Sequence, residues 1–220
     1  MQVQSNLPPT KEGIITFIGA GTGLGMAKGI VNKNKIIAIP SEGGHKEFAA
    51  RTNQEWEIYN WLKKDLNLKR LAVERIVSGS GLGHIARWRL NKSDCANHSL
   101  KNIADCWRNH ENKTDLDFPA LVSEVAYSGD EIMKEVIDIW LSAYGSAAGD
   151  LALQELCQGG LWIAGGTAAK HIDGLCSEIF LNAFKNKGRF ESYLEKIPIM
   201  AITDPEIGLY SAACKTRTIA

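Results

Sequence analysis

Three short apolar runs near the start of the chain have the pattern of strands. They cover residues 14–19, 26–31 and 35–40, and each contains isoleucine or valine and is bounded by turn-forming residues. Residues 32–34, Asn-Lys-Asn, can form the hairpin turn between the last two runs. The pattern therefore predicts a short antiparallel meander, preceded by a polar tail or interdomain linker at residues 1–13.

In the middle of the chain, apolar residues recur with the spacing of a helix. Large apolar side chains between residues 56 and 66 recur every three to four positions, so one helical face is apolar. Thr52 or Asn53 is the candidate N-cap of this helix. The polar residues 92–117 have no clear period and predict a surface loop. Further helices are predicted at residues 81–91, 119–127 and 130–157.

The last third of the chain alternates between strand and helix patterns. Strands are predicted at residues 161–166 and 198–203, with a helix at 188–196 between them. A final helix is expected to begin at Asp204-Pro205, since an acidic N-cap followed by proline is a typical start. The whole order predicts a mixed α/β fold around a central sheet.

The composition excludes several classes of protein but does not indicate a function. The 220 residues carry 25 basic and 25 acidic side chains, and this balance argues against a general nucleic-acid partner or an anionic membrane surface. No apolar run approaches the roughly 20 residues that cross a bilayer, and residues 1–13 lack the features of a signal peptide. Five scattered cysteines without C-x-x-C spacing favour a reducing, cytoplasmic location and predict no metal site.

The candidate chemistry begins with a glycine-rich run, GAGTGLG, at residues 19–25. It fails the dinucleotide pattern G-x-G-x-x-G because Leu24 takes the third glycine position, and it lacks the Gly-Lys-Ser/Thr of a P-loop. Both motifs would lead into a helix, whereas a strand is predicted here. Gly21, Thr22 and Gly23 can still bring backbone N–H groups and a hydroxyl close to an anion. An ordinary hairpin turn is the alternative.

A cluster of polar residues follows the meander. Glu42 and His45 flank Gly43-Gly44, which can bend the chain so that both side chains turn toward one small ligand. Glu74 lies inside an apolar run, where a carboxylate is costly without a partner. Two carboxylates and an imidazole suit a polyhydroxylated ligand, because its hydroxyl groups can donate to them. The alternative is two solvated surface acids and a loop histidine.

Five segments taken together closely resemble the bacterial-type, ATP-dependent glucokinases. They are GTGLG at 21–25, SEGGHKEF at 41–48, VERIVSGSGL at 73–82, LWIAGG at 161–166 and KGRFESYLEKIPI at 187–199. The resemblance implies an actin-like ATPase, RNase H-like fold with a mixed central sheet and flanking helices. It also implies that residues 14–220 form the large domain and its C-terminal helix, with the small N-terminal domain absent.

The resemblance implies two groups of site residues. Glucose would contact Gly23, Glu42, His45 and Glu74, and ATP would contact Gly21, Thr22, Gly165 and Gly166. A simple strand-to-helix turn is the alternative for the last two glycines. The implied reaction moves the γ-phosphoryl group of Mg²⁺-bound ATP to the 6-hydroxyl of glucose, the first step of glycolysis. A homodimer is compatible with this family.

Two family motifs have no match. The first phosphate loop, Asp-x-Gly-Gly-Thr, and the Asn-Asp pair that carries the catalytic aspartate do not occur, and Asp65 is the first aspartate of the chain. We therefore assign no catalytic residue and, because the aspartate is missing, expect poor turnover from this chain alone. Either Met1 is a misplaced start or the chain is a truncated gene product. The alternatives to a glucokinase are a non-catalytic sugar-binding remnant and a kinase for another hexose or acceptor.

Overall fold

A six-stranded sheet organises the molecule. The structure, a computed structural model, describes residues 1–4, 8–10, 12–33, 35–110, 117–204, 206–208 and 210–211. In spatial order the strands are β1 (Gln2–Gln4), β6 (Ile199–Ala201), β5 (Leu161–Ala164), β2 (Gly13–Ala20), β3 (Leu24–Asn32) and β4 (Lys35–Ser41). The antiparallel meander β2–β3–β4 is confirmed, and β5 and β6 extend it in parallel with β2. The predicted mixed sheet is therefore present.

The first residues of the chain depart from the expected tail. Residues Gln2–Gln4 form β1, which pairs antiparallel with β6 at the edge of the sheet. The amino group of Met1 donates to the Ala201 carbonyl oxygen (2.7 Å), and Gln4 Nε2 donates to the Leu194 carbonyl oxygen (2.9 Å). The prediction was wrong here because a three-residue polar strand has no recognisable pattern. Its partner strand is also distant in sequence.

Helices fill the rest of the described chain. They are α1 (Asn53–Asp65), α2 (Gly79–Leu90), α3 (Lys101–His110), α4 (Phe118–Tyr127), α5 (Glu131–Glu155), α6 (Gly166–Lys170), α7 (Ile172–Leu175), α8 (Glu178–Lys185) and α9 (Glu191–Leu194), with 3₁₀ turns η1 (Gly43–His45), η2 (Val73–Arg75), η3 (Ser93–Cys95) and η4 (Gly188–Phe190). Thr52 is confirmed as the N-cap of α1, since its hydroxyl accepts from the Glu55 N–H (3.1 Å). Among these described helices, none combines the length and the apolar character needed to span a membrane.

Three helical regions differ from the prediction. The expected loop at 92–117 contains η3 and α3. The sequence did not reveal α3 because the stripe that its described side chains bury, which includes Ala104 and Trp107, is narrow. The short helices α6 and α7 and the amphipathic α8 were not predicted. The helix expected at 188–196 is η4 followed by α9. The final helix is only partly described: Ile207, Gly208, Tyr210 and Ser211 are helical, and Pro205, Leu209 and residues 212–220 lie outside the described part.

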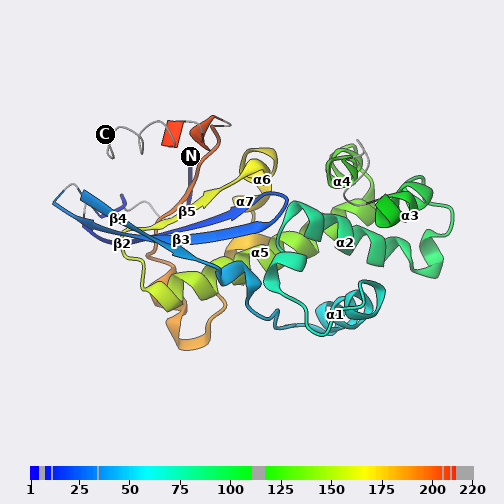
Figure 1. Ribbon diagram of the computed structural model, residues 1–220, viewed down its shortest axis with the longest axis horizontal. Helices are drawn as coiled ribbons and strands as arrows, with labels where there is room; N and C mark the ends of the chain where they lie inside the picture. Colours follow the sequence, from blue (N-terminus) through cyan, green and yellow to red (C-terminus); the bar gives the residue numbers. More distant parts are fainter. Residues whose placement is uncertain are drawn as a thin grey trace.

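The long helix α5 connects the sheet with the other helices. In Figure 1 it runs beneath the sheet and on toward α2, while α1–α4 gather beyond the end of the sheet. Its side chains Trp140 and Tyr144 are fully buried and pack edge to face, with ring centroids 5.3 Å apart. The core is therefore continuous from the sheet to the helical group.

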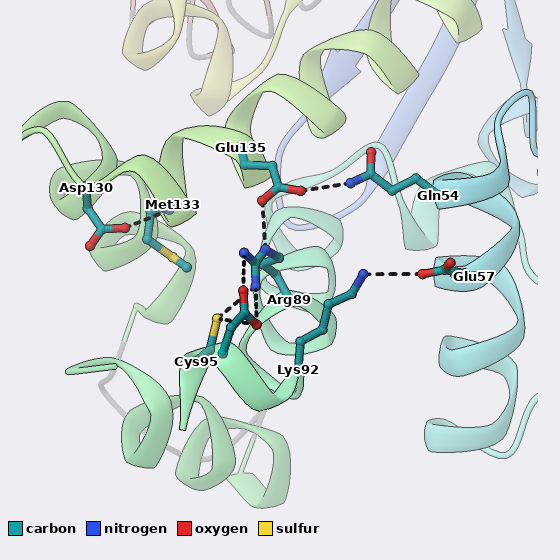
Figure 2. A network of polar contacts seen from close by, with 9 residues as sticks. Gln54, Glu57, Arg89, Lys92, Cys95, Asp130, Met133 and Glu135 are labelled. Carbon is teal, nitrogen blue, oxygen red and sulfur yellow. Dashed lines mark hydrogen bonds and ion pairs between the residues drawn. The ribbon is translucent and has the colours of Figure 1, made fainter. Parts of the chain in front are cut away.

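A network of charged side chains joins four of these elements. Arg89 on α2 donates from Nε to Glu135 on α5 (2.7 Å) and from its two amino groups to Asp94 in η3 (3.1 and 2.9 Å). Gln54 on α1 donates to the other oxygen of Glu135 (2.8 Å), as Figure 2 shows. The two carboxylates, Asp94 first, raise the pKa of Arg89 above its usual range. The network links α1, α2, η3 and α5 and helps to fix their relative positions.

Candidate functional site

A three-residue turn, Gly21–Gly23, lies at the centre of the candidate site. It joins β2 to β3, and the Gly21 N–H donates across it to the Gly23 carbonyl oxygen (2.8 Å). Two bonds fasten the turn to the start of α2: the Gly79 N–H donates to the Gly21 carbonyl oxygen (2.7 Å), and Ser80 Oγ donates to the Thr22 carbonyl oxygen (3.1 Å). The turn is therefore a hairpin turn held by a helix that lies far along the chain.

Glu74 is fixed against the last residue of this turn. It lies in η2, and its Oε2 accepts from the Leu24 N–H (2.9 Å). A Cβ on Gly23 would lie 2.6 Å from the same oxygen, so only glycine leaves room for the carboxylate. The acid that the sequence left without a partner is thus held by the backbone of β3.

His45 lies between the two acids of the polar cluster. Its Nε2 is 3.7 Å from Glu42 Oε2, and its Nδ1 is 4.0 Å from Glu74 Oε1. Both separations exceed a hydrogen bond, so the imidazole and the carboxylates keep donors and acceptors for a ligand. The side chain of Glu42 is 92% exposed, that of His45 53% and that of Glu74 25%. The structure brings the three predicted residues together, with Glu74 the most enclosed.

The two glycines between Glu42 and His45 let η1 lie directly on β3. A Cβ on Gly44 would lie 2.2 Å from the Leu24 carbonyl oxygen. Arg70 donates to the His45 carbonyl oxygen (2.7 Å) and holds the far end of η1. Close backbone packing at Gly44 and the hydrogen bond from Arg70 therefore position His45 together.

A cavity of about 350 Å³ adjoins the other end of the turn. It is bounded by the turn, the start of α2, α3, the start of α4 and the α6–α7 region. Its lining residues are Gly21, Thr22, Gly79, Ser80, Leu82, Trp107, Asp117, Pro119, Ala120, Ser123, Gly166, Thr167, Lys170 and His171. The volume lies within the range of about 300 to 1,000 Å³ of small-molecule sites. Gly21 and Thr22 line this cavity while Gly23 contacts Glu74, so one turn serves two adjoining sites.

The glycines after β5 have different positions. Gly166 lines the cavity, whereas Gly165 does not. Gly165 has φ +92°, and a Cβ there would lie 2.4 Å from the Ala20 carbonyl oxygen. Thr167 Oγ1 donates to the same oxygen (2.8 Å). Gly165 therefore allows the start of α6 to approach the end of β2, and it shapes the cavity without lining it.

Several cavity residues were missed by sequence reasoning. Trp107, Ser123, Lys170 and His171 come from α3, α4, α6 and the α6–α7 junction, and of these only α4 was predicted. Asp117 carried a readable signal: it precedes Phe-Pro, and its carboxylate caps α4 by accepting from the Ala120 N–H (3.1 Å). Burial, followed by the nearby Lys170, lowers the pKa of His171 to about 4. The imidazole is therefore neutral at pH 7.

No metal centre accompanies this site in the part of the chain that the structure describes. Within that part, no group of three or more His, Cys, Asp or Glu side chains could hold a metal ion. The charged residues that line the cavity are Asp117 and Lys170.

Curated relatives match almost the whole chain. A glucokinase of Synechocystis sp. is 35% identical over an alignment of 212 positions, which covers 94% of this chain and 59% of the relative. A glucokinase of Nostoc punctiforme is 36% identical over an alignment of 222 positions, which covers 99% of this chain and 64% of the relative. The chain spans about three fifths of the length of these relatives.

Solved structures share the fold. The glucokinase from an Antarctic psychrotroph superposes with a TM-score of 0.76 at 25% identity, covering 97% of this chain and 60% of that one. The Balamuthia mandrillaris glucokinase, solved in complex with glucose, superposes with a TM-score of 0.68 at 19% identity and covers 91% of this chain and 52% of its own. A ROK family glucokinase from Streptomyces griseus, in complex with glucose and AMPPNP, gives 0.53 at 20% identity, covering 87% and 56%. The likenesses confirm the predicted actin-like ATPase fold.

The family itself follows from the sequence match. The sequence model of the family described as Glucokinase matches residues 1–219. Since this match extends over nearly the whole chain and agrees with the fold, the chain belongs to the glucokinase family.

Proposed function

We propose that this chain holds glucose and ATP side by side for transfer of the γ-phosphoryl group to the 6-hydroxyl of the sugar. One observation carries the proposal. The Glu74 carboxylate is fixed by the Leu24 N–H at one end of the Gly21–Gly23 turn, and the other end of that turn lines the 350 Å³ cavity. A polyol on Glu74 and a nucleotide in the cavity would therefore meet at the turn.

Glucose is the ligand of the polar cluster in this proposal. Its hydroxyl groups donate to Glu74 and Glu42, and the His45 imidazole offers ring nitrogens for further hydrogen bonds. Because these groups would be left unpaired by a sugar lacking the matching hydroxyls, the cluster also discriminates among sugars. The Balamuthia relative was solved with glucose, which supports this choice of ligand.

The cavity takes the nucleotide. The phosphates lie toward Gly21, where no side chain stands in the way, and toward the hydroxyl group of Thr22. The fixed turn and the cavity wall keep the two substrates oriented, which is a large part of catalysis in phosphoryl transfer. The Streptomyces relative was solved with glucose and AMPPNP, which supports a nucleotide beside the sugar.

Mg²⁺ is the expected companion of ATP. It commonly binds substrate phosphates together with one or two carboxylates. The described residues offer no cluster of ligands for it, so we assign it no step on this chain.

A second candidate function is binding without transfer. The sequence contains no Asn-Asp pair and no aspartate before Asp65, so none of its residues matches the family's catalytic base. A sugar-binding remnant, or a kinase whose base comes from outside these residues, would use the same polar cluster. Both candidates predict glucose binding, and only turnover separates them.

Glucose binding by acid variants tests the proposal. Replacing Glu74 by Gln should weaken glucose binding at least about tenfold in isothermal titration, because a hydrogen bond to a charged acceptor is worth about 1.5–3 kcal/mol. Glu42→Gln should have a smaller effect, since that side chain is 92% exposed.

Glu195→Gln is the matched control, because this exposed acid follows α9 and lies outside the polar cluster. It should bind glucose like the unmodified chain. Unchanged glucose affinity in both Glu42→Gln and Glu74→Gln would remove these acids from the site.

A further inference from the structure

The wall of the cavity contains a chain of hydrogen bonds with a fixed direction. Tyr127 Oη lies 2.7 Å from His171 Nδ1, and His171 Nε2 lies 3.4 Å from Ser123 Oγ. Ser123 Oγ in turn donates to the Pro119 carbonyl oxygen (3.0 Å). The chain links the α6–α7 junction to α4, and Ser123 and His171 both line the cavity.

The direction follows from counting protons. The single hydroxyl proton of Ser123 is directed to Pro119, so Ser123 Oγ must accept from His171 Nε2. His171 is neutral, since burial lowers its pKa to about 4, and therefore carries one N–H. With that proton on Nε2, Nδ1 accepts from the Tyr127 hydroxyl. Each of the three protons in this series of hydrogen bonds, on Tyr127, His171 and Ser123, therefore has its acceptor.

The consequence is that Ser123 can only accept a hydrogen bond from a ligand in the cavity. Ser123 Oγ has a remaining lone pair and no free proton. Asp117, the N-cap of the same helix, also lines the cavity and offers a carboxylate. The nearby lining is apolar: Trp107 packs against Phe118 at the start of α4, with ring centroids 5.3 Å apart, and Pro119 and Ala120 follow. An apolar slot edged by acceptors suits a planar base with an amino group.

We infer that Ser123 is a specificity-determining residue for the nucleotide base, accepting a hydrogen bond from the 6-amino group of adenine. His171 and Tyr127 are positioning residues, which keep the Ser123 lone pair available to the ligand and its proton away from it. The inference rests on the proposed function, because it takes this cavity as the nucleotide site.

Hypoxanthine is the informative contrast to adenine. It carries a carbonyl oxygen where adenine carries the 6-amino group, so it would place an acceptor against the Ser123 lone pair. Sites built for a hydrogen bond reject analogues that leave a polar group unpaired. The chain should therefore bind ADP more tightly than IDP.

The test is calorimetric titration of the full 220-residue chain with ADP and with IDP. Ser123→Ala should weaken ADP binding about fivefold, the effect of one ordinary hydrogen bond, and leave IDP binding nearly unchanged. Ser128→Ala is the matched control: its hydroxyl donates to the Val125 carbonyl oxygen (2.8 Å) at the exposed end of the same helix. The control should keep the ADP preference of the unmodified chain.

Tyr127→Phe tests the positioning role. It removes the donor to His171 Nδ1, so the imidazole proton can move to that nitrogen. Ser123 then receives no proton from His171 and can turn its own hydroxyl proton toward a carbonyl oxygen of the ligand. We expect the preference for ADP over IDP to fall while the melting temperature changes little. A purely structural role of the phenol would instead lower the affinity for both nucleotides equally.

Each remaining outcome overturns a distinct statement. If ADP binds but Ser123→Ala keeps the ratio of ADP to IDP affinity, the inference fails and the nucleotide site stands. If neither nucleotide binds at millimolar concentration, the inference and the proposed ATP role fail together.

Discussion

Gly23 positions a carboxylate by having no side chain. Replacing it with alanine would place a Cβ 2.6 Å from Glu74 Oε2 and push the carboxylate off the Leu24 N–H. The displaced group is the end of a flexible side chain, so the fold should survive. We expect Gly23→Ala to weaken glucose binding about tenfold and to change the free energy of unfolding by less than about 1 kcal/mol. Calorimetry and urea unfolding measure the two quantities.

Gly25, two residues further along the chain in β3, provides the control. At Gly25 a Cβ would meet only the Gly19 carbonyl oxygen, at an ordinary 3.9 Å. Gly25→Ala should therefore bind glucose normally. If both variants bind glucose equally well, the fixed position of Glu74 does not matter for the sugar.

Two buried histidines make stability depend on acid. Burial lowers the pKa of His84 from 6.5 to about 3 and that of His171 to about 4, so both are neutral in the folded chain. Between pH 6.5 and these values the unfolded chain binds the extra protons, and stability falls as the pH falls. From pH 7 to pH 5 we expect each to cost about 2 kcal/mol.

Urea unfolding at pH 7, 6 and 5 measures this loss. His171→Asn, which cannot titrate, should show a shallower pH dependence than the unmodified chain. A flat profile for the unmodified chain over this range would contradict the neutral burial of both histidines.

The sequence predicted the polar cluster of the candidate site better than it predicted the residues of the cavity. Glu42, His45 and Glu74 were read as one cluster because their chemistry is legible without the fold, and the structure brings them together. Their roles toward glucose stay predictions. Ser123 and His171 could not be found in the same way, since a serine on a helix and a histidine between two short helices carry no signal until the cavity is known.

At the scale of elements, the Arg89 network tests how the helical group is held (Figure 2). Arg89→Met removes the donor to Glu135 and Asp94, whose side chains are 40% and 60% exposed. Because Arg89 itself is only 11% exposed, its loss should lower the free energy of unfolding by about 1–3 kcal/mol. Urea unfolding followed by circular dichroism measures the change.

Lys92→Met is the control from the same helix end. Its pair with Glu57 spans 3.3 Å between side chains that are 42% and 59% exposed. Such pairs are worth about 0–1 kcal/mol, so the control should lose less stability than Arg89→Met. Equal losses would show that charge at this end of α2, rather than the network, is what matters.

Helices and strands were predictable where their hydrophobic pattern was long enough to show a period. The meander strands and α1, α2, α4 and α5 had clear patterns, and their predicted bounds differ from the observed ones by at most three residues. The helix α3 lacked a wide apolar stripe, and β1 is too short to show alternation. Pairing of β1 with β6 is a tertiary contact between segments about 200 residues apart, which no local pattern encodes.

At the scale of the whole molecule, turnover separates the two candidate functions. The purified chain with glucose, ATP and Mg²⁺ should release ADP slowly or not at all, since no residue matches the family's catalytic aspartate. A coupled assay for ADP measures this, with glucose-free reactions as the control. Robust glucose-dependent release would refute the need for a base from outside these residues.

The fold class was predictable for the whole molecule because the order of strands and helices limits the arrangement of the sheet. Three meander strands followed by strands separated by helices predict a mixed sheet, and a mixed sheet is observed. The family resemblance supplied the rest, and the chain still spans only about three fifths of its curated relatives.

The turn Gly21–Gly23 belongs to both candidate sites, with Gly23 against Glu74 and Gly21 and Thr22 in the cavity wall. Any ligand that shifts this turn changes the backbone geometry that the other ligand meets. The two affinities are then thermodynamically linked, and the linkage is reciprocal. Whatever factor a nucleotide adds to the affinity for the sugar, the sugar must add to the affinity for the nucleotide, so three glycine-turn residues would make two binding events cooperative without any movement of a domain.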